Sequence, residues 1–229
     1  MRIELEILAF MQFAYSSGAF DQALRRGDLT QLEFIDAVAR ETLFDGVVLD
    51  DRHFPRTDSD YLAQIKKMCA DLGLTVAALA SDAFFVAEED AMRAAIDRAL
   101  ALGAPLLAGR LGAETALPWS EQLHKLSAAS SLAKSANVTL AVRNAPGTFA
   151  ATEHDCKRVS KETDSAWLRY GLEPTAFDAA SDVASLREKT VLLWVAAREA
   201  PLDAIWHNFH GFAVIEKTQP HVASSMRGN

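Results

Sequence analysis

The chain has 229 residues, of which 50% are hydrophobic, and this length and composition suit one large α/β domain with a sizeable core. Its formal net charge of −8 excludes a general nucleic-acid surface, because phosphate binding depends on clustered Lys and Arg. No apolar run reaches about 18 residues, so we expect no membrane span. Glu4 and Glu6 interrupt the apolar start, and Cys69 and Cys156 show no metal-ligand spacing, so we expect a cytoplasmic protein with reduced thiols.

The first half of the chain alternates apolar strand candidates with helices. Strands are predicted over residues 3–12, 46–50, 74–80 and 105–111. A polar loop is predicted over residues 15–28, and Thr30 with Glu33 then forms a capping box that begins a helix. Further helices are predicted from Asp58 or Ser59 to Gly73, over residues 88–102 and over residues 118–136.

The second half keeps this alternation. The stretch 137–147 carries an apolar run that is typical of a strand buried on both faces, and the run ends abruptly at Arg143. Thr152 is expected to cap a helix over residues 153–163. Three more strands are predicted over residues 167–172, 191–197 and 212–216, with short helical pieces over residues 182–189 and 202–207. Residues 217–229 show no apolar periodicity and are expected to form a loose tail.

Eight strand candidates separated by helices indicate right-handed βαβ units and a parallel sheet. The sequence therefore predicts a single (β/α)8 TIM barrel over residues 1–216, with a short or missing last helix. A doubly wound open sheet is the alternative, although no GxGxxG follows the first strand. A missing helix exposes apolar surface, so we also expect a homo-oligomer, in particular a homodimer.

Arginines occur at the predicted carboxyl ends of three strands, where the active sites of such barrels lie. These residues are Arg110, Arg143 and Arg198. One interpretation is that together they form a pocket for a phosphate, carboxylate or sulfate. The alternative is that each of them pairs with a nearby acid and binds no ligand. The acids considered as partners are Glu114, Glu173 and Glu199.

His53 follows the second predicted strand at the same end of the barrel. A histidine at this place can serve as an acid or base near neutral pH, or it can be a loop side chain in contact with solvent. Asp50 and Asp51 precede it and point to opposite sides if the chain is extended, so they make a weak carboxylate pair. Trp194 lies on the seventh predicted strand and is the tryptophan of most interest for a site.

Several long segments together resemble the xylose isomerase-like barrel superfamily, which includes sugar and sugar-phosphate isomerases and epimerases and metal-dependent endonucleases. The segments are residues 32–54, 61–80, 95–107, 140–159, 168–177 and 211–216. The resemblance implies a barrel with its site at the carboxyl ends of the strands. It also implies a divalent metal ion held by two Glu, one Asp and one His.

Most of the metal ligands that the resemblance implies are replaced in this sequence. The position of the fifth-strand Glu falls on Arg143, before Asn144, and the sixth-strand Asp falls on Glu173; only Glu216 stands as in the family. The positions of the family's His residues, and of a further Glu on the second strand, fall on other residues: Ala145, Ala176, residues 193–197 and Val48. A guanidinium repels a nearby divalent cation, so we expect no bound metal and no other cofactor. Arg143 then supplies the positive charge, with Glu173 and Glu216 as its partners.

Three functional interpretations follow. The first is an isomerase or epimerase for a small anionic sugar, sugar acid or sugar phosphate, with Glu173 and Glu216 in catalysis. The arginines named above, with His53 and Asn144, would bind its substrate. The second is a non-catalytic barrel that binds an anionic metabolite or a protein partner. The third is a metal-dependent endonuclease, which requires a ligand set and a basic surface that this sequence lacks.

Overall fold

The computed structural model describes residues 11–178, 181–197, 206 and 209–218. In it, eight parallel strands pair in chain order, and β8 pairs with β1, so the sheet closes into a barrel. The strands are β1 (Gln12–Ser16), β2 (Gly46–Asp50), β3 (Thr75–Ala80), β4 (Leu106–Arg110), β5 (Thr139–Arg143), β6 (Leu168–Leu172), β7 (Thr190–Val195) and β8 (Phe212–Ile215). The predicted (β/α)8 barrel is confirmed, and the open doubly wound sheet is excluded.

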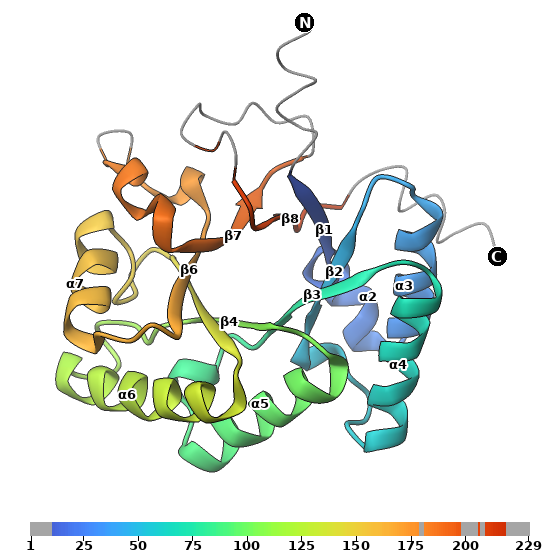
Figure 1. The fold of residues 1–229 in the computed structure, drawn as a ribbon, viewed down its shortest axis with the longest axis horizontal. Helices are drawn as coiled ribbons and strands as arrows, with labels where there is room; N and C mark the ends of the chain where they lie inside the picture. Colours follow the sequence, from blue (N-terminus) through green and yellow to red (C-terminus); the bar gives the residue numbers. More distant parts are fainter. Residues whose placement is uncertain (1–10, 179–180, 198–205, 207–208, 219–229) are drawn as a thin grey trace, which may run out of the picture.

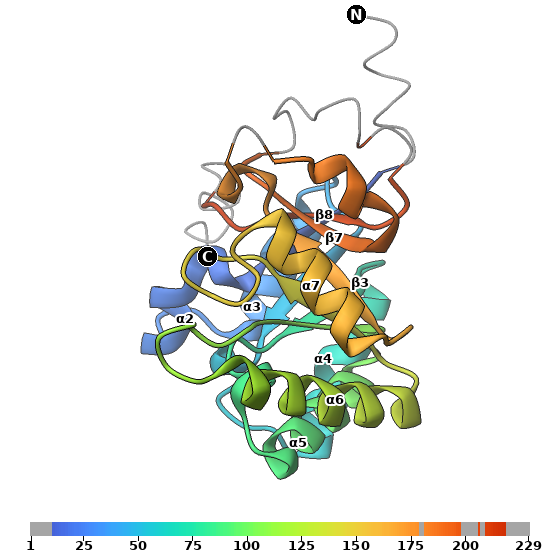
Figure 2. The same cartoon turned by 90° about the vertical axis from the view of Figure 1, so that its left-hand side faces the viewer.

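Helices surround the strand ring, as Figure 1 shows, and α5, α6 and α7 pack along its outer face in Figure 2. The α-helices are α2 (Asp21–Arg26), α3 (Gln31–Arg40), α4 (Ser59–Asp71), α5 (Glu89–Leu102), α6 (Trp119–Ala136) and α7 (Glu153–Thr163). Short 3₁₀ turns follow several strands: η2 (Ser17–Phe20), η3 (Asp51–His53), η4 (Phe84–Val86), η5 (Pro174–Ala176) and η6 (Val183–Lys189). Among the described residues, no helix is long and apolar enough to cross a membrane.

Local sequence fixes where these helices begin. Thr30 caps α3 and forms the predicted capping box with Glu33, and Asp58 caps α4 by accepting a bond from the Tyr61 amide. Thr152 forms a second capping box with Asp155 at the start of α7. Each cap satisfies backbone N–H groups that have no partner within the helix.

Replacing Thr152 by Ala is expected to lower the free energy of unfolding by about 1 kcal/mol. The reason is that the Thr152 hydroxyl accepts the Asp155 amide at 3.1 Å, and Ala cannot. Urea denaturation measures the change. Thr152→Ser keeps the hydroxyl and should remain close to the parent, so equal losses in the two variants would contradict the capping role.

The first strand was predicted wrongly. The sequence predicts a strand over residues 3–12 and a loop from Tyr15, whereas β1 runs over Gln12–Ser16 and is followed by η2 and α2. Residues 3–10 lie outside the described residues, as do most of the predicted helical piece over residues 202–207 and the tail beyond residue 218. Tyr15 is fully buried and packs at 4.9 Å, between ring centroids, against Phe44. Tyr15 pairs with Val47 of β2 and Ile215 of β8, and this pairing makes a strand of a segment whose polar residues suggested a loop.

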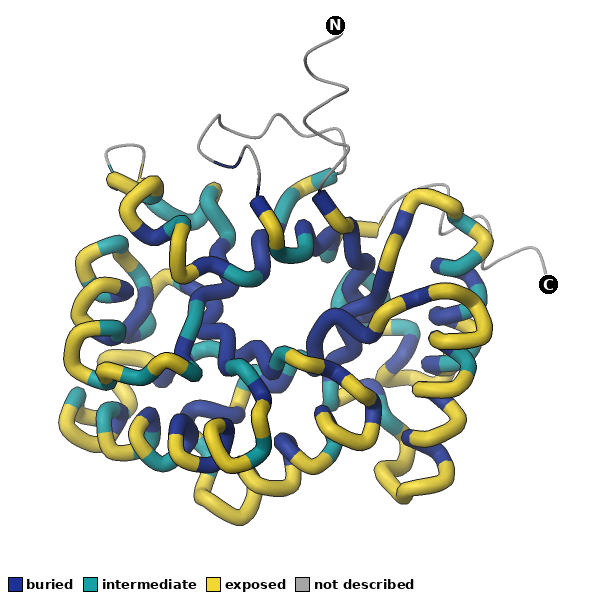
Figure 3. The backbone as a smooth tube through the Cα atoms, viewed as in Figure 1, coloured by how far each residue is buried: buried dark blue, intermediate teal, exposed yellow. Residues whose placement is uncertain are grey.

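The core has two parts, and buried residues concentrate along the strand ring in Figure 3. The larger part lies between the strands and the helices and includes Phe34, Ile65 and Ile96. The smaller part contains only strand residues, mostly Ala and Val, and therefore fills the barrel interior. Its one aromatic residue is Trp194. Small side chains on the other strands leave room for this indole and for the charged residues above it.

Candidate functional site

Arg143 ends β5 and lies at the centre of a cluster of charges at the barrel mouth, where only 9% of it is exposed. Its Nη2 donates to Glu173 Oε2 at 3.1 Å and pairs with Glu216 Oε2 at 2.6 Å. These carboxylates follow β6 and β8, so barrel closure brings together three residues that lie far apart in the sequence. The structure thus pairs Arg143 with the two acids that the sequence suggested as its partners.

Trp194 forms the floor beneath this ion-pair cluster. The Arg143 guanidinium lies 4.4 Å from the centroid of the indole, a distance typical of a cation–π contact. Gly171 of β6 makes room for the ring, since a Cβ at that position would lie 2.5 Å from Trp194 Cζ3. The indole Nε1 is buried and has no hydrogen-bond partner among the described residues.

The two carboxylates keep Arg143 charged despite its burial. Removal from water by itself lowers the pKa of Arg143, because it disfavours the charged form. The bonds and charges of Glu216 and Glu173 oppose this effect, and the pKa of Arg143 is raised above its ordinary value. The cluster therefore holds a permanent cation in a place with little access to solvent.

Residues at the end of β1 hold the Glu216 carboxylate. Ser16 Oγ donates to Glu216 Oε1 at 3.2 Å and itself accepts the Gly18 amide at 3.1 Å. A Cβ at Gly18 would lie 2.6 Å from Glu216 Oε1. Glycine at position 18 is thus required for the close approach of this carboxylate.

The Gly18→Ala variant is expected to fold normally but to displace Glu216. The Cβ would meet the end of a flexible side chain, so the carboxylate moves away while the backbone stays in place. A crystal structure of the variant should show Glu216 Oε2 more than about 3.5 Å from Arg143 Nη2, beyond hydrogen-bond distance. Ser16→Ala removes a hydrogen bond without adding bulk and should keep the pair. An intact Arg143–Glu216 pair in Gly18→Ala would contradict the expectation.

Asn144 positions Glu173. Its side chain accepts the Glu173 amide at 2.7 Å and donates to the Glu173 carbonyl at 3.1 Å, and the residue is 1% exposed. The side-chain amide of Asn144 thus both accepts a hydrogen bond from the backbone of Glu173 and donates one to it. These bonds fix the loop that carries one carboxylate, and the predicted contact of Asn144 with a substrate stays a prediction.

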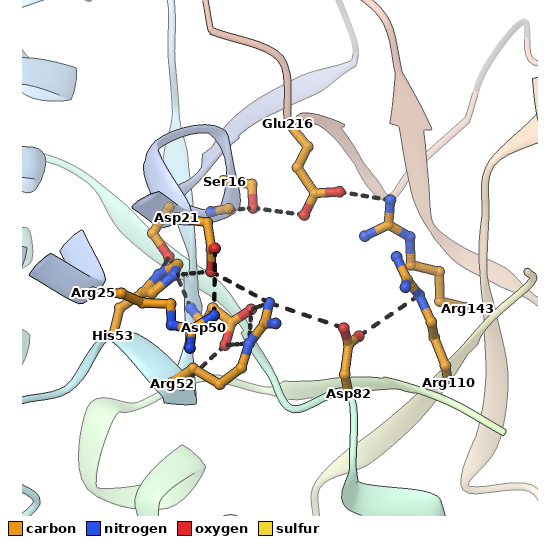
Figure 4. Close-up of polar contacts among 12 residues, drawn as sticks. Ser16, Asp21, Arg25, Asp50, Arg52, His53, Asp82, Arg110, Arg143 and Glu216 are labelled. Carbon is orange, nitrogen blue, oxygen red and sulfur yellow. Dashed lines mark hydrogen bonds and ion pairs between the residues drawn. The ribbon is translucent and has the colours of Figure 1, made fainter. Parts of the chain in front are cut away.

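Arg110 lies beside Arg143, because the two residues are partners in the register of β4 and β5. Its Nε lies 3.7 Å from Asp82 Oδ1, so its acid is Asp82, which follows β3, and not one of the acids suggested from the sequence. The side chain is 41% exposed. Arg110 and Arg143 therefore place two guanidinium groups on one side of the mouth, as Figure 4 shows. Arg198, the third predicted arginine, lies outside the described residues.

His53 is buried, and the prediction of a solvent-contacting loop histidine is wrong. Its Nδ1 lies 2.9 Å from Ser17 Oγ and its Nε2 lies 2.9 Å from Asp21 Oδ1. Ser17 Oγ already accepts the Asp50 amide, so we assign its hydroxyl hydrogen to Nδ1 and the ring hydrogen to Nε2. The hydrogen bond from His53 lowers the pKa of Asp21. With both ring nitrogens bonded, His53 braces the mouth, and its predicted contact with a substrate stays a prediction.

Sequence reasoning missed Arg52 and Asp82, which link the two sides of the mouth in Figure 4. Arg52 Nε donates to Asp50 Oδ1 at 2.9 Å, and Arg52 Nη2 lies 3.9 Å from Asp82 Oδ2. The bonds to Asp50 raise the pKa of Arg52. Both residues closely follow strand ends, and this position was the signal that could have found them. The neighbouring Asp51 instead pairs with Arg98 at 3.5 Å, so the two adjacent aspartates have separate partners.

A pocket of about 240 Å³ opens above the cluster. Arg143, Glu173, Trp194 and Glu216 line it, together with Thr175 of η5 and other residues at the ends of β7 and β8. It combines an apolar ring face, two carboxylates and a buried cation, which are suited to a small polar anion or to proton transfer.

The metal ion implied by the family resemblance does not fit these residues. The described part of the chain holds no group of three or more His, Cys, Asp or Glu side chains that could bind one. The Arg143 guanidinium takes the space between Glu173 and Glu216, the two carboxylates that remain at the ligand positions. A cation already bonded to both acids repels a divalent ion strongly at low effective dielectric.

Comparisons with solved structures agree with the barrel. A fusion protein of a xylose isomerase-like TIM barrel and 4-hydroxyphenylpyruvate dioxygenase is 16% identical, with a TM-score of 0.70 over 96% of this chain, which spans only 42% of that protein. An AP endonuclease of family 2 from Brucella melitensis is 16% identical, with a TM-score of 0.71, over 93% of this chain and 96% of its own. An L-ribulose 3-epimerase is also 16% identical, with a TM-score of 0.71, over 96% of this chain and 86% of its own.

Similarity at these identities shows the fold alone, so membership of a family depends on the sequence comparison. No curated protein sequence matches the chain. A family model, however, described as a xylose isomerase-like TIM barrel, matches residues 37–187, which is more than half of the chain. The chain therefore belongs to the xylose isomerase-like TIM barrel family.

Proposed function

We propose that this protein is a metal-independent isomerase or epimerase for a small anionic sugar, sugar acid or sugar phosphate. One observation carries the proposal: a buried, charged arginine lies between two partly exposed carboxylates in a pocket at the barrel mouth. The likeness to an L-ribulose 3-epimerase and to the 3-keto-D-glucoside 4-epimerase YcjR from E. coli supports a sugar as the substrate class.

The chemistry is proton transfer at a carbon next to a carbonyl group. Glu216 takes the proton, and the electron pair of the broken C–H bond moves into the carbonyl, leaving an enediolate oxygen that Arg143 stabilises. Glu173, after taking up a proton from solvent, then donates it. In an epimerase the proton goes to the opposite face of the same carbon; in an isomerase it goes to the former carbonyl carbon, while the hydroxyl proton on the first carbon passes to the former carbonyl oxygen. Because the two carboxylates come from different strands and flank the guanidinium, one can remove a proton and the other can return one.

An anionic group on the substrate is held by the arginines. Arg110 lies beside Arg143 in register and keeps only one distant acid, Asp82, among the described residues. A guanidinium in this state binds a carboxylate or phosphate through paired N–H donors. The proposal keeps Arg198 in the same role from the sequence alone, where it follows the predicted strand over residues 191–197.

The proposal is tested with protein treated with EDTA and incubated in D₂O. Aldose and ketose phosphates and sugar acids are followed by NMR for deuterium uptake at the carbon next to the carbonyl. We expect uptake and isomer formation that added Mn²⁺ or Mg²⁺ does not increase. Activity that appears only with metal, or no binding and no uptake with any of these compounds, would overturn the proposal.

A second function is a non-catalytic sensor of an anionic metabolite. It is favoured by the fact that one nitrogen, Arg143 Nη2, engages both carboxylates, so that neither is without a cationic partner. The same experiment separates the two functions, since a sensor binds a sugar acid in calorimetry without deuterium uptake.

A further inference from the structure

The guanidinium of Arg143 uses one terminal nitrogen for both acids and leaves the other unbonded. Nη2 lies 3.1 Å from Glu173 Oε2 and 2.6 Å from Glu216 Oε2. Nη1 makes no hydrogen bond or ion pair among the described residues, and, unlike Nε, it is not fully buried. Because Arg143 lines the pocket of about 240 Å³, Nη1 presents its N–H donors there. In Figure 4 this second terminal nitrogen points toward the middle of the mouth.

The indole of Trp194 is the flat surface over which this guanidinium lies. The central carbon of the Arg143 guanidinium is 4.4 Å from the ring centroid, well within the range of a cation–π contact. The ion pairs hold only one nitrogen of the group, so by themselves they leave the rest of it able to turn. Contact with an aromatic face restrains the whole plane, because the guanidinium is planar and stacks on such faces. The orientation of Nη1 toward the pocket therefore depends on Trp194.

The indole itself is held firmly by the barrel. Trp194 is 4% exposed and packs inside the ring of strands among small side chains such as Ala141 and Val214. Trp194 and Val214 are also partners in the register of β7 and β8. On the other side, the missing side chain of Gly171 on β6 admits the ring edge. The ring cannot move unless the neighbouring strands move, so it is a rigid support for a cation.

Packing alone does not require an indole at position 194. The Nε1 of Trp194 is buried and has no hydrogen-bond partner in the part of the chain that the structure describes, and such a donor costs stability. A phenylalanine ring would occupy much of the same space without this cost. Tryptophan differs in attracting a cation to its face more strongly than phenylalanine does. The indole is thus suited to hold Arg143 more than to fill the barrel.

We propose that Trp194 is a positioning residue for the reaction at the mouth. It holds the Arg143 guanidinium in the orientation in which Nη2 keeps both carboxylates and Nη1 donates to the substrate oxygen that gains negative charge. The inference rests on the proposed function and deepens it, because it names the atom that meets the enediolate oxygen. A donor that is already in place needs no reorganisation when the charge develops.

Kinetics of Trp194→Leu, with the compounds of the deuterium-uptake experiment, test this role. We expect kcat to fall by about 10²-fold, as for one lost oxyanion donor. KM should stay within about twofold of the parent value, because the interaction is made only in the transition state. Trp194→Phe keeps an aromatic face and should recover part of the loss. Trp119→Leu is the matched control: Arg158 lies 4.3 Å from the Trp119 ring, neither residue lines the pocket, and kcat and KM should not change.

NMR of the unliganded protein tests the orientation of Arg143 apart from any reaction. Exchange between its Nη1 and Nη2 signals, which Arg143→Gln identifies by their loss, should be about tenfold faster or more in Trp194→Leu. Trp194→Phe should give a smaller increase, and it supplies the comparison if the Leu variant does not fold. Equal exchange rates in the parent and these variants, or an unchanged kcat, would overturn the proposal. Faster exchange in the variants, with no deuterium uptake by the parent, would overturn the proposed function and leave the positioning of Arg143 by Trp194 supported.

Discussion

The Arg143→Glu variant is expected to bind Mn²⁺, which the parent protein should not do. In the parent, the side chain at position 143 lies between Glu173 and Glu216 and pairs with both. Glutamate at this position adds a third carboxylate to the cluster, and oxygen ligands of this kind suit Mn²⁺ and Mg²⁺. At Mn²⁺ concentrations about 100 times the Kd, the Tm of the variant should rise by about 5–10 °C.

Differential scanning fluorimetry with and without Mn²⁺ measures this change, after treatment with EDTA. Without metal, the variant should be less stable than the parent, because three carboxylates then repel one another. Arg143→Gln serves as the matched control: it removes the cation, adds no ligand and should show no response to Mn²⁺. A rise in Tm of the parent protein with Mn²⁺ would mean that Arg143 does not replace the metal.

The Glu216→Gln variant is expected to lose deuterium uptake from D₂O by about 10²–10⁴-fold, the usual contribution of a positioned acid or base. The amide has nearly the same shape as the carboxylate and can still accept a bond from Ser16, so the change removes the base with little effect on packing. Glu173 remains to pair with Arg143. The Tm should therefore stay within a few degrees of the parent value.

Two further variants give this prediction its controls. Glu173→Gln should retain deuterium uptake through Glu216 but lose formation of the isomer, because the second proton donor is missing. Glu121→Gln changes an exposed acid on the distant helix α6 and should leave both readouts unchanged. If Glu216→Gln retained full uptake, Glu216 would not be the base, and the binding function would be favoured.

The sequence was sufficient to predict the barrel, because the features that specify each element are local. Apolar runs of strand length, the capping boxes at Thr30 and Thr152 and the glycine after α5 each act within a few residues. The end of β5 at Arg143 followed from the abrupt change of polarity at that point. The prediction of the first strand was wrong because the polar and small residues after Tyr15 suggested a loop. Only the pairing of Tyr15 with β2 and β8 shows that it belongs to a strand.

Within the site, the sequence predicted Arg143 as the central cation but only some of the side chains around it. Arg143 with Glu173 and Glu216 could be inferred, because the family resemblance places all three positions at strand ends. The pairing of Arg110 with Asp82 could not be inferred from the sequence, because it depends on how the turn after β3 lies against the end of β4. The burial of His53 depends likewise on contacts with Ser17 and Asp21, which lie 36 and 32 residues away in the chain.

The sequence alone thus determined the order of strands and helices and the charge at the end of β5, since both are set by neighbouring residues. The tertiary structure decided which groups meet at the mouth: the closed sheet joins β8 to β1 and so brings Glu216 to Ser16 across 200 residues. It also decided that Trp194 lies beneath Arg143, because that contact requires the absence of a side chain at Gly171 on the neighbouring strand. In a closed barrel these contacts are made between residues on adjacent strands. Such residues lie far apart in the sequence, so no local sequence pattern reveals that they meet.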